Sequence, residues 1–140
     1  MTTPRGVLFL CVANSARSQL GEALARGLFG DEVRVQSAGS RPSQVNPLAL
    51  EVLRENGVEA TGQTSKSVDT IDPATVDTVI TLCAEEECPL VLGAAARLHW
   101  GMPDPAGGAG SLDEQLDGFR RARDALRVRL AKWRDDGFPR

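Results

Sequence analysis

The strongest constraint on the fold is the alternation of short apolar runs with helical patterns along the chain. The runs at 7–10, 33–37, 78–82 and 97–100 have the length and the β-branched or apolar character of buried strands. Helical patterns lie at 19–25, between Asn46 and Gly57, and from Ser111 onward. Strands separated by helices run parallel. The sequence therefore predicts an α/β fold: one domain over 1–140, with a four-stranded parallel sheet flanked by helices on both faces.

Two of the helical patterns carry start signals. Asn46 followed by Pro47 is typical of an N-cap with proline at the first helical position, and the expected inner face of that helix is Leu48, Val52 and Leu53. Ser111 and Glu114 have the spacing of a capping box. The apolar stripe expected on the last helix is Leu112, Leu116, Phe119, Leu126, Leu130 and Trp133. The arginines expected on its solvated face are Arg120, Arg121, Arg123, Arg127 and Arg129.

Composition excludes several classes of protein. The net charge is −3, and no basic cluster is long enough to follow a phosphate backbone, which argues against a nucleic-acid partner. The apolar run at 7–10 is too short for a signal peptide or a membrane span. Three cysteines, an odd number, fit thiol chemistry better than a disulfide framework. We therefore expect a cytoplasmic protein with no membrane partner. We also expect a monomer, because no feature of the sequence requires a second copy of the chain.

The segment between the first strand and the first helix is the clearest candidate site. Cys11 and Arg17 stand six positions apart in it, separated by small residues. A loop in this place presents free N–H groups and the positive end of the helix dipole to a bound anion. Arg17 offers a fork of donors for two oxygens, and the same positive field favours the thiolate form of Cys11, a nucleophile. The predicted oxyanion-binding residues are Val12, Ala13, Asn14, Ser15, Ala16, Arg17 and Ser18.

Two side chains of this loop have further expected roles. Asn14 tolerates a left-handed backbone, and Ser18 is placed to donate a hydrogen bond to the Cys11 thiolate. Cys83 and Asp104 follow the third and fourth strands, so we expect them at the same sheet edge as Cys11. The alternative for Cys11 is a buried structural cysteine beside a solvated arginine.

The loop resembles that of the low-molecular-weight protein tyrosine phosphatase superfamily, which includes the thiol-dependent arsenate reductases. The resemblance extends through five further segments, at 37–39, 45–47, 63–66, 81–83 and 99–105. The later segments look like the arsenate reductase branch.

The resemblance implies a mechanism. Cys11 attacks arsenate while Asp104, in an Asp-Pro pair, protonates the leaving hydroxide. Cys83 then attacks Cys11 and arsenite leaves, and Cys88 attacks Cys83 to give a disulfide that an external thioredoxin reduces. Phosphate and sulfate are expected as competing anions, with no tightly bound cofactor.

Alternatives remain open at this stage. Asp104 suits an Asx turn, Cys83 and Cys88 suit small buried hydrophobes, and His99 suits a hydrogen-bonded structural role. Only four residues separate Cys83 from Cys88, and a helix would hold their Cα atoms roughly 8–9 Å apart, too far for a disulfide. The competing functions are a cysteine-dependent phosphatase on a protein or small phosphoester and a non-catalytic oxyanion-binding or redox-sensing module.

Two features bear on substrate and metal. Tyrosine is absent, and the small residues at 106–108 follow the Asp-Pro pair, which favours a small inorganic anion over an aromatic phosphoester. Some related reductases bind potassium through residues that match Asn14, Glu22 and Ser37. Lys66 lies where an acidic ligand is often found, and its ammonium could replace the cation. No metal is therefore predicted.

Overall fold

The computed structural model describes residues 3–60, 62–83 and 95–140. Four strands, β1 (Gly6–Cys11), β2 (Arg34–Gly39), β3 (Thr78–Thr81) and β4 (Ala96–His99), form one sheet in the order β2-β1-β3-β4. Every pair in it is parallel. The predicted α/β fold with a four-stranded parallel sheet is confirmed.

Strand β1 lies at the centre of the sheet and is buried along its whole length. Val7 and Phe9 face one core cluster, and Leu8 and Leu10 face the other. Its last residue, Cys11, is in register with Gly39 at the end of β2. Because the strands are parallel, their carboxyl ends meet at one edge of the sheet, where the candidate site was expected.

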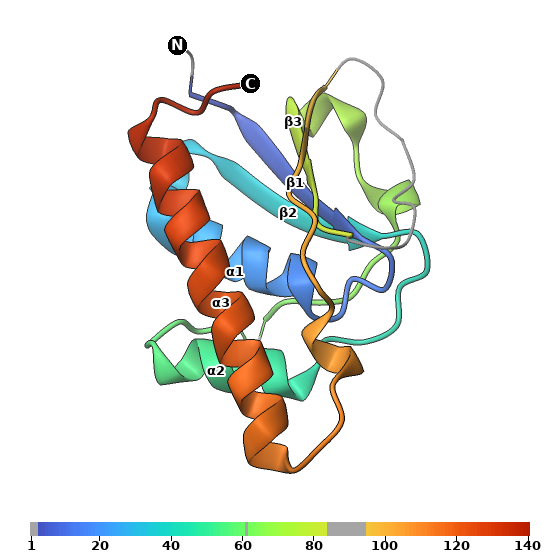
Figure 1. Ribbon diagram of the computed structural model, residues 1–140. Helices are drawn as coiled ribbons and strands as arrows, with labels where there is room; N and C mark the ends of the chain where they lie inside the picture. Colours follow the sequence, from blue (N-terminus) through green and yellow to red (C-terminus); the bar gives the residue numbers. More distant parts are fainter. Residues whose placement is uncertain (1–2, 61, 84–94) are drawn as a thin grey trace.

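The two faces of the sheet are covered differently. The helices α1 (Arg17–Phe29), α2 (Pro47–Glu55) and α3 (Leu112–Asp135) pack together on the face of Val7 and Phe9 (Figure 1). In the described chain the segment that packs on the opposite face contributes Val68, in the 3-10 helix η2 (Val68–Thr70), and Ile71 and Val76, on either side of the 3-10 helix η3 (Pro73–Thr75). Two others, η1 (Gly30–Glu32) and η4 (Pro105–Gly107), lie before β2 and before α3. Both faces of the sheet are therefore covered, and all the α-helices of the described residues lie on the face of Val7 and Phe9.

The predicted helix starts are confirmed in detail. The Asn46 side chain accepts a hydrogen bond of 2.9 Å from the N–H of Leu48. Ser111 and Glu114 form the capping box, with Ser111 Oγ accepting from the N–H of Glu114 at 3.2 Å. The stripe of α3 is wrong at Leu112, which is 61% exposed because it opens the helix beyond the packed core.

The prediction that places Arg123 among the arginines of the solvated face of α3 is also wrong. Arg123 is only 8% exposed and donates to the carbonyl of Val52 at 2.7 Å, which joins α3 to α2. The guanidinium of Arg129 lies 4.7 Å from the ring centre of Trp100, within cation–π range. Although α3 has 24 residues, no helix in the described chain combines the length and apolar character needed to cross a membrane.

Candidate active site

The loop after β1 is held with its carbonyl groups turned toward the surrounding chain. Four of its carbonyl groups accept hydrogen bonds from backbone N–H groups outside the loop or in α1. The carbonyl of Val12 accepts from Arg41 at 2.9 Å, that of Ala13 from Ser43 at 3.1 Å, that of Ser15 from Asn46 at 2.9 Å, and that of Ala16 from Leu20 at 2.9 Å. The side chain of Gln19 donates to the remaining carbonyl, that of Asn14, at 3.0 Å. Peptide planes fixed in this way turn their N–H groups toward the inside of the loop.

The N–H groups inside the loop find no acceptor in the part of the chain that the structure describes. Within the described residues, the amides of residues 13–16 donate to no protein acceptor. Ala16, the N-cap of α1, contributes no side-chain cap. The loop and the N-terminus of α1 therefore offer a set of donors suited to a tetrahedral oxyanion.

The candidate nucleophile lies beneath this loop. Cys11 is a free, buried thiol whose Sγ is 2.8 Å from Ser18 Oγ. Asn14 Nδ2 donates to the same Ser18 oxygen at 2.8 Å. Asn14 has a φ of 48°, the left-handed conformation that the sequence suggested it tolerates.

Arg17 is anchored at the mouth of the site. Its side chain is 6% exposed, and Nη1 donates to the carbonyls of Met102 at 3.2 Å and Leu82 at 3.4 Å. Its Nη2 lies 3.9 Å from Asp104 Oδ2. The guanidinium thus links the loop to the segments that follow β3 and β4, and the edge placement expected from the topology is realised.

Asp104 forms the Asx turn that the sequence allowed, and its second carboxylate oxygen faces Arg17. Its Oδ1 accepts from the N–H of Ala106 at 3.0 Å and caps η4, which is the Asx turn. Its Oδ2 faces Arg17, and its side chain is 49% exposed. A carboxyl group held this way by one oxygen keeps the other directed toward the loop.

The other candidates are placed as follows. Cys83 is buried two residues beyond β3 and is disulfide-bonded, whereas Cys11 is free. Cys88 lies outside the described residues. His99 Nδ1 is 2.6 Å from Thr81 Oγ1, which supports the structural role expected for it.

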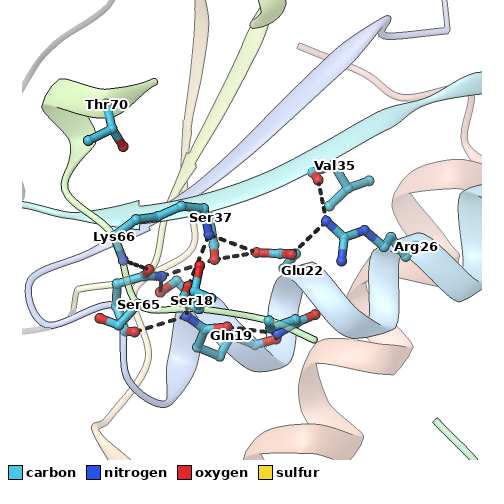
Figure 2. A network of polar contacts seen from close by, with 12 residues as sticks. Ser18, Gln19, Glu22, Arg26, Val35, Ser37, Ser65, Lys66 and Thr70 are labelled. Atoms are coloured by element: carbon cyan, nitrogen blue, oxygen red, sulfur yellow. Dashed lines mark hydrogen bonds and ion pairs between the residues drawn. The ribbon is translucent and has the colours of Figure 1, made fainter. Parts of the chain in front are cut away.

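Behind the loop lies a buried polar network that joins Asn14, Ser37 and Glu22, the three residues that match a potassium site. Figure 2 shows the side chains of Ser37 and Glu22 directed toward one another. Ser37 Oγ donates to Glu22 Oε1 at 2.5 Å, and Asn14 Nδ2 donates to Ser37 Oγ at 2.9 Å. Lys66 Nζ lies 3.6 Å from Glu22 Oε1, so its ammonium neighbours the carboxylate as the sequence suggested. In the described chain, no group of three or more His, Cys, Asp or Glu residues is arranged to hold a metal.

Sequence reasoning missed two supports of the loop. Gln19, on α1, donates to the carbonyls of Asn14 and Thr64 at 3.0 Å each, and Gln63 donates to Gln19 Oε1 at 2.7 Å. Gly39 lies so close to the loop that an added Cβ would meet the Val12 carbonyl oxygen at 2.4 Å. Gln63 and Gly39 belong to segments that the resemblance had selected, but only the spatial arrangement shows what they contact.

Residues 6–136 match the family model described as low molecular weight phosphotyrosine protein phosphatase. The chain belongs to this family. Within it, the chain is 38% identical over 133 residues to an arsenate reductase of Bacillus subtilis, covering 94% of this chain and 96% of the relative. An arsenate reductase of Halalkalibacterium halodurans gives the same identity and coverage.

Solved structures agree with this placement. The structure of an arsenate reductase in the phosphate binding state superposes with a TM-score of 0.81 at 29% identity, covering 94% of this chain and 98% of its own. A thioredoxin-dependent arsenate reductase of Corynebacterium glutamicum gives a TM-score of 0.63 at 30% identity, covering 93% of this chain and 64% of its own. A tyrosine phosphatase of Erwinia amylovora, at 19% identity and a TM-score of 0.75, shares the fold alone. The resemblance read from the later segments is confirmed.

Proposed function

We propose that this protein reduces arsenate to arsenite, using electrons delivered by a thioredoxin-type reductant. The observation that carries the proposal is the free Cys11 thiol beneath a loop whose amides at 13–16 have no acceptor among the described residues. Similarity to arsenate reductases over nearly the whole chain supports arsenate as the oxyanion.

In the first step the Cys11 thiolate attacks arsenic. A sulfur–arsenic bond forms, one arsenic–oxygen bond breaks, and the oxygen leaves as water after Asp104 supplies a proton. Arg17 and the loop amides stabilise the charge on the remaining oxygens. The Ser18 hydroxyl, 2.8 Å from Sγ, stabilises the attacking thiolate.

In the second step the thiolate of Cys83, formed once its disulfide has been reduced, attacks the sulfur of Cys11. A sulfur–sulfur bond forms, the sulfur–arsenic bond breaks, and its electron pair stays on arsenic, which leaves as arsenite. Arg17 supports this step because it donates to the carbonyl of Leu82, the residue before Cys83. Both sulfurs belong to buried residues at the carboxyl edge of the sheet.

In the third step Cys88 attacks Cys83. This restores the Cys11 thiolate and leaves a Cys83–Cys88 disulfide, which the external dithiol reduces. We place this chemistry in the cytoplasm, where thioredoxin-type reductants keep thiols reduced, and assign it to a monomer without a tightly bound cofactor.

Phosphoester hydrolysis is a second candidate favoured by one observation. A cavity of about 640 Å³ adjoins Asp104, between the segment 102–109 and the first half of α3. It is large enough for an organic leaving group. None of the described residues that line it is aromatic and able to stack on a phenol ring, so we rank this activity below arsenate reduction.

A coupled assay with arsenate, thioredoxin, thioredoxin reductase and NADPH tests the proposal. Arsenate reduction predicts sustained, arsenate-dependent NADPH oxidation that phosphate and sulfate inhibit competitively. Hydrolysis of p-nitrophenyl phosphate without any arsenate-dependent NADPH oxidation would instead establish the phosphatase. Neither activity, with phosphate still bound, would identify a binding or sensing module.

A further inference from the structure

The buried network behind the loop contains an ion pair that touches neither Cys11 nor the oxyanion site. Glu22, in the middle of α1, is 2% exposed. Arg26 Nη2 lies 2.7 Å from its Oε2, and Lys66 Nζ lies 3.6 Å from its Oε1. Each carboxylate oxygen of Glu22 thus lies beside a cationic donor, and a carboxylate only accepts hydrogen bonds.

This carboxylate fixes the direction of the first hydrogen bond in the network. Ser37 Oγ is 2.5 Å from Glu22 Oε1, the short distance of an O–H donating to a charged oxygen. The hydroxyl proton of Ser37 therefore lies in the hydrogen bond to Glu22. Toward Asn14, 2.9 Å away, the Ser37 oxygen can act only as an acceptor.

The amide of Asn14 is oriented by two independent contacts. The backbone N–H of Lys66 donates to Asn14 Oδ1 at 2.8 Å, so this atom must be the oxygen. Its NH2 group then points at two oxygens, Ser37 Oγ at 2.9 Å and Ser18 Oγ at 2.8 Å. A flipped amide would set N–H against N–H at Lys66 and leave the Ser37 oxygen without a donor.

The direction of the last bond, between Ser18 and Cys11, is fixed in the same way. Ser18 Oγ accepts from Asn14, so its own proton is available for Cys11 Sγ, 2.8 Å away. A hydroxyl that donates to sulfur stabilises the thiolate, whereas one that accepts from S–H stabilises the thiol. Every buried side-chain nitrogen and oxygen in the described chain has a hydrogen-bond partner, so the network is fully paired in this arrangement.

We propose that Glu22 and Lys66 are positioning residues whose ion pair, acting through Ser37 and Asn14, fixes Ser18 as a hydrogen-bond donor to Cys11. Lys66 contributes twice, because its ammonium supports the carboxylate and its backbone N–H orients Asn14. The proposal rests on Cys11 being the nucleophile of the proposed function, but it concerns the state of the thiol and not the fate of arsenic.

The test measures the pH dependence of Cys11 alkylation in the reduced full-length protein. Iodoacetamide labelling is quantified by mass spectrometry on the tryptic peptide 6–17, in which Cys11 is the single cysteine. Glu22→Gln replaces the acceptor-only carboxylate with an amide that can turn its oxygen toward Arg26 and its NH2 group toward Ser37. We expect the labelling midpoint to rise by about one pH unit, which is about tenfold less thiolate at a given lower pH. Lys66→Met removes the ammonium and keeps the backbone N–H, so a smaller rise is expected while Arg26 remains.

Matched variants separate this role from a merely structural one. Lys66→Arg retains a cation and should restore the wild-type midpoint. Lys132→Met breaks an exposed ion pair of 2.9 Å with Asp136 on α3 and should leave the midpoint unchanged. Thermal unfolding of each variant is measured in parallel, since a purely structural role would lower stability and leave the midpoint in place.

The result that overturns the proposal is a folded Glu22→Gln or Lys66→Met protein with the wild-type midpoint. An equal rise in Lys132→Met would also overturn it, because the effect would then reflect net charge. If Glu22→Gln does not fold, the comparison of Lys66→Met with Lys66→Arg decides alone, since Lys66 is partly exposed. Failure of arsenate reduction with the midpoints shifted as expected would refute the proposed function and leave the positioning role standing.

Discussion

Substitution of Gly39 by alanine should damage the anion loop directly. Gly39 ends β2 beside Cys11, and an ideal Cβ there would lie 2.4 Å from the Val12 carbonyl oxygen and 2.9 Å from the Asn14 nitrogen. Both atoms belong to the backbone, so no side-chain rotation can relieve the contact. The loop or the end of β2 must move by about 1 Å to reach an ordinary contact distance near 3.4 Å.

The expected magnitude follows from that displacement. Overpacking of this kind lowers the free energy of unfolding by about 1–3 kcal/mol. Alanine also reduces the entropy of the unfolded chain, which offsets about 0.4–1 kcal/mol of that loss. We therefore expect Gly39→Ala to be destabilised by roughly 1–2 kcal/mol, a fall in Tm of about 3–8 °C for a domain of this size. A catalytic loop displaced by about 1 Å can lose on the order of 10²-fold in turnover.

Thermal unfolding followed by tryptophan fluorescence, phosphate titration by calorimetry and the NADPH-coupled assay measure the three effects. Gly27→Ala is the matched control, because Gly27 is exposed on α1 with no atom within 4 Å of its added Cβ. It should gain up to about 1 kcal/mol of stability and keep full turnover. Wild-type Tm and turnover in Gly39→Ala would refute the close approach between β2 and the loop.

Three further predictions concern the core, the surface and the proposed acid. Leu130→Ala, at a fully buried position, should cost about 2–5 kcal/mol in urea unfolding, whereas Val128→Ala, 69% exposed, should change stability by less than about 0.5 kcal/mol. A hydrogen bond from Arg120 lowers the pKa of Glu55 from 4.5 to about 2, so its stabilisation is complete above pH 4.5 and is lost as the pH falls toward 2. The stability difference between wild type and Glu55→Gln should shrink over that interval, and a constant difference would contradict the ion pair. Asp104→Asn should keep the cap on η4 and the phosphate affinity but lose about 10²–10⁴-fold in turnover, and unchanged turnover would remove the general acid.

The parts of the fold that the sequence predicted are those encoded locally. The N-cap at Asn46 and the capping box at Ser111 each depend on residues within one helical turn, and both form as expected. The left-handed Asn14 follows from its own side chain. The Cys11 and Arg17 placement depends only on a strand, a short loop and a helix in succession.

The parts that were missed depend on contacts between distant segments. Arg123 is buried because the Val52 carbonyl, 71 residues earlier in the chain, accepts its hydrogen bond, and helical periodicity carries no information about such a partner. The reason for Gly39 appears only once the register pairs it with Cys11. The 3-10 helices in the segment that packs on the second face have no periodicity long enough to read from sequence.

The most direct test of the central claim is the disulfide formed in a single arsenate turnover by Cys88→Ser. The proposed relay predicts that this variant releases one equivalent of arsenite and accumulates a Cys11–Cys83 disulfide, which peptide mapping detects. Cys83→Ser should form the arsenic adduct and release no arsenite, and Cys11→Ser should form no adduct. Full thioredoxin-linked turnover by Cys88→Ser, or arsenite release by Cys83→Ser, would contradict the three-thiol mechanism.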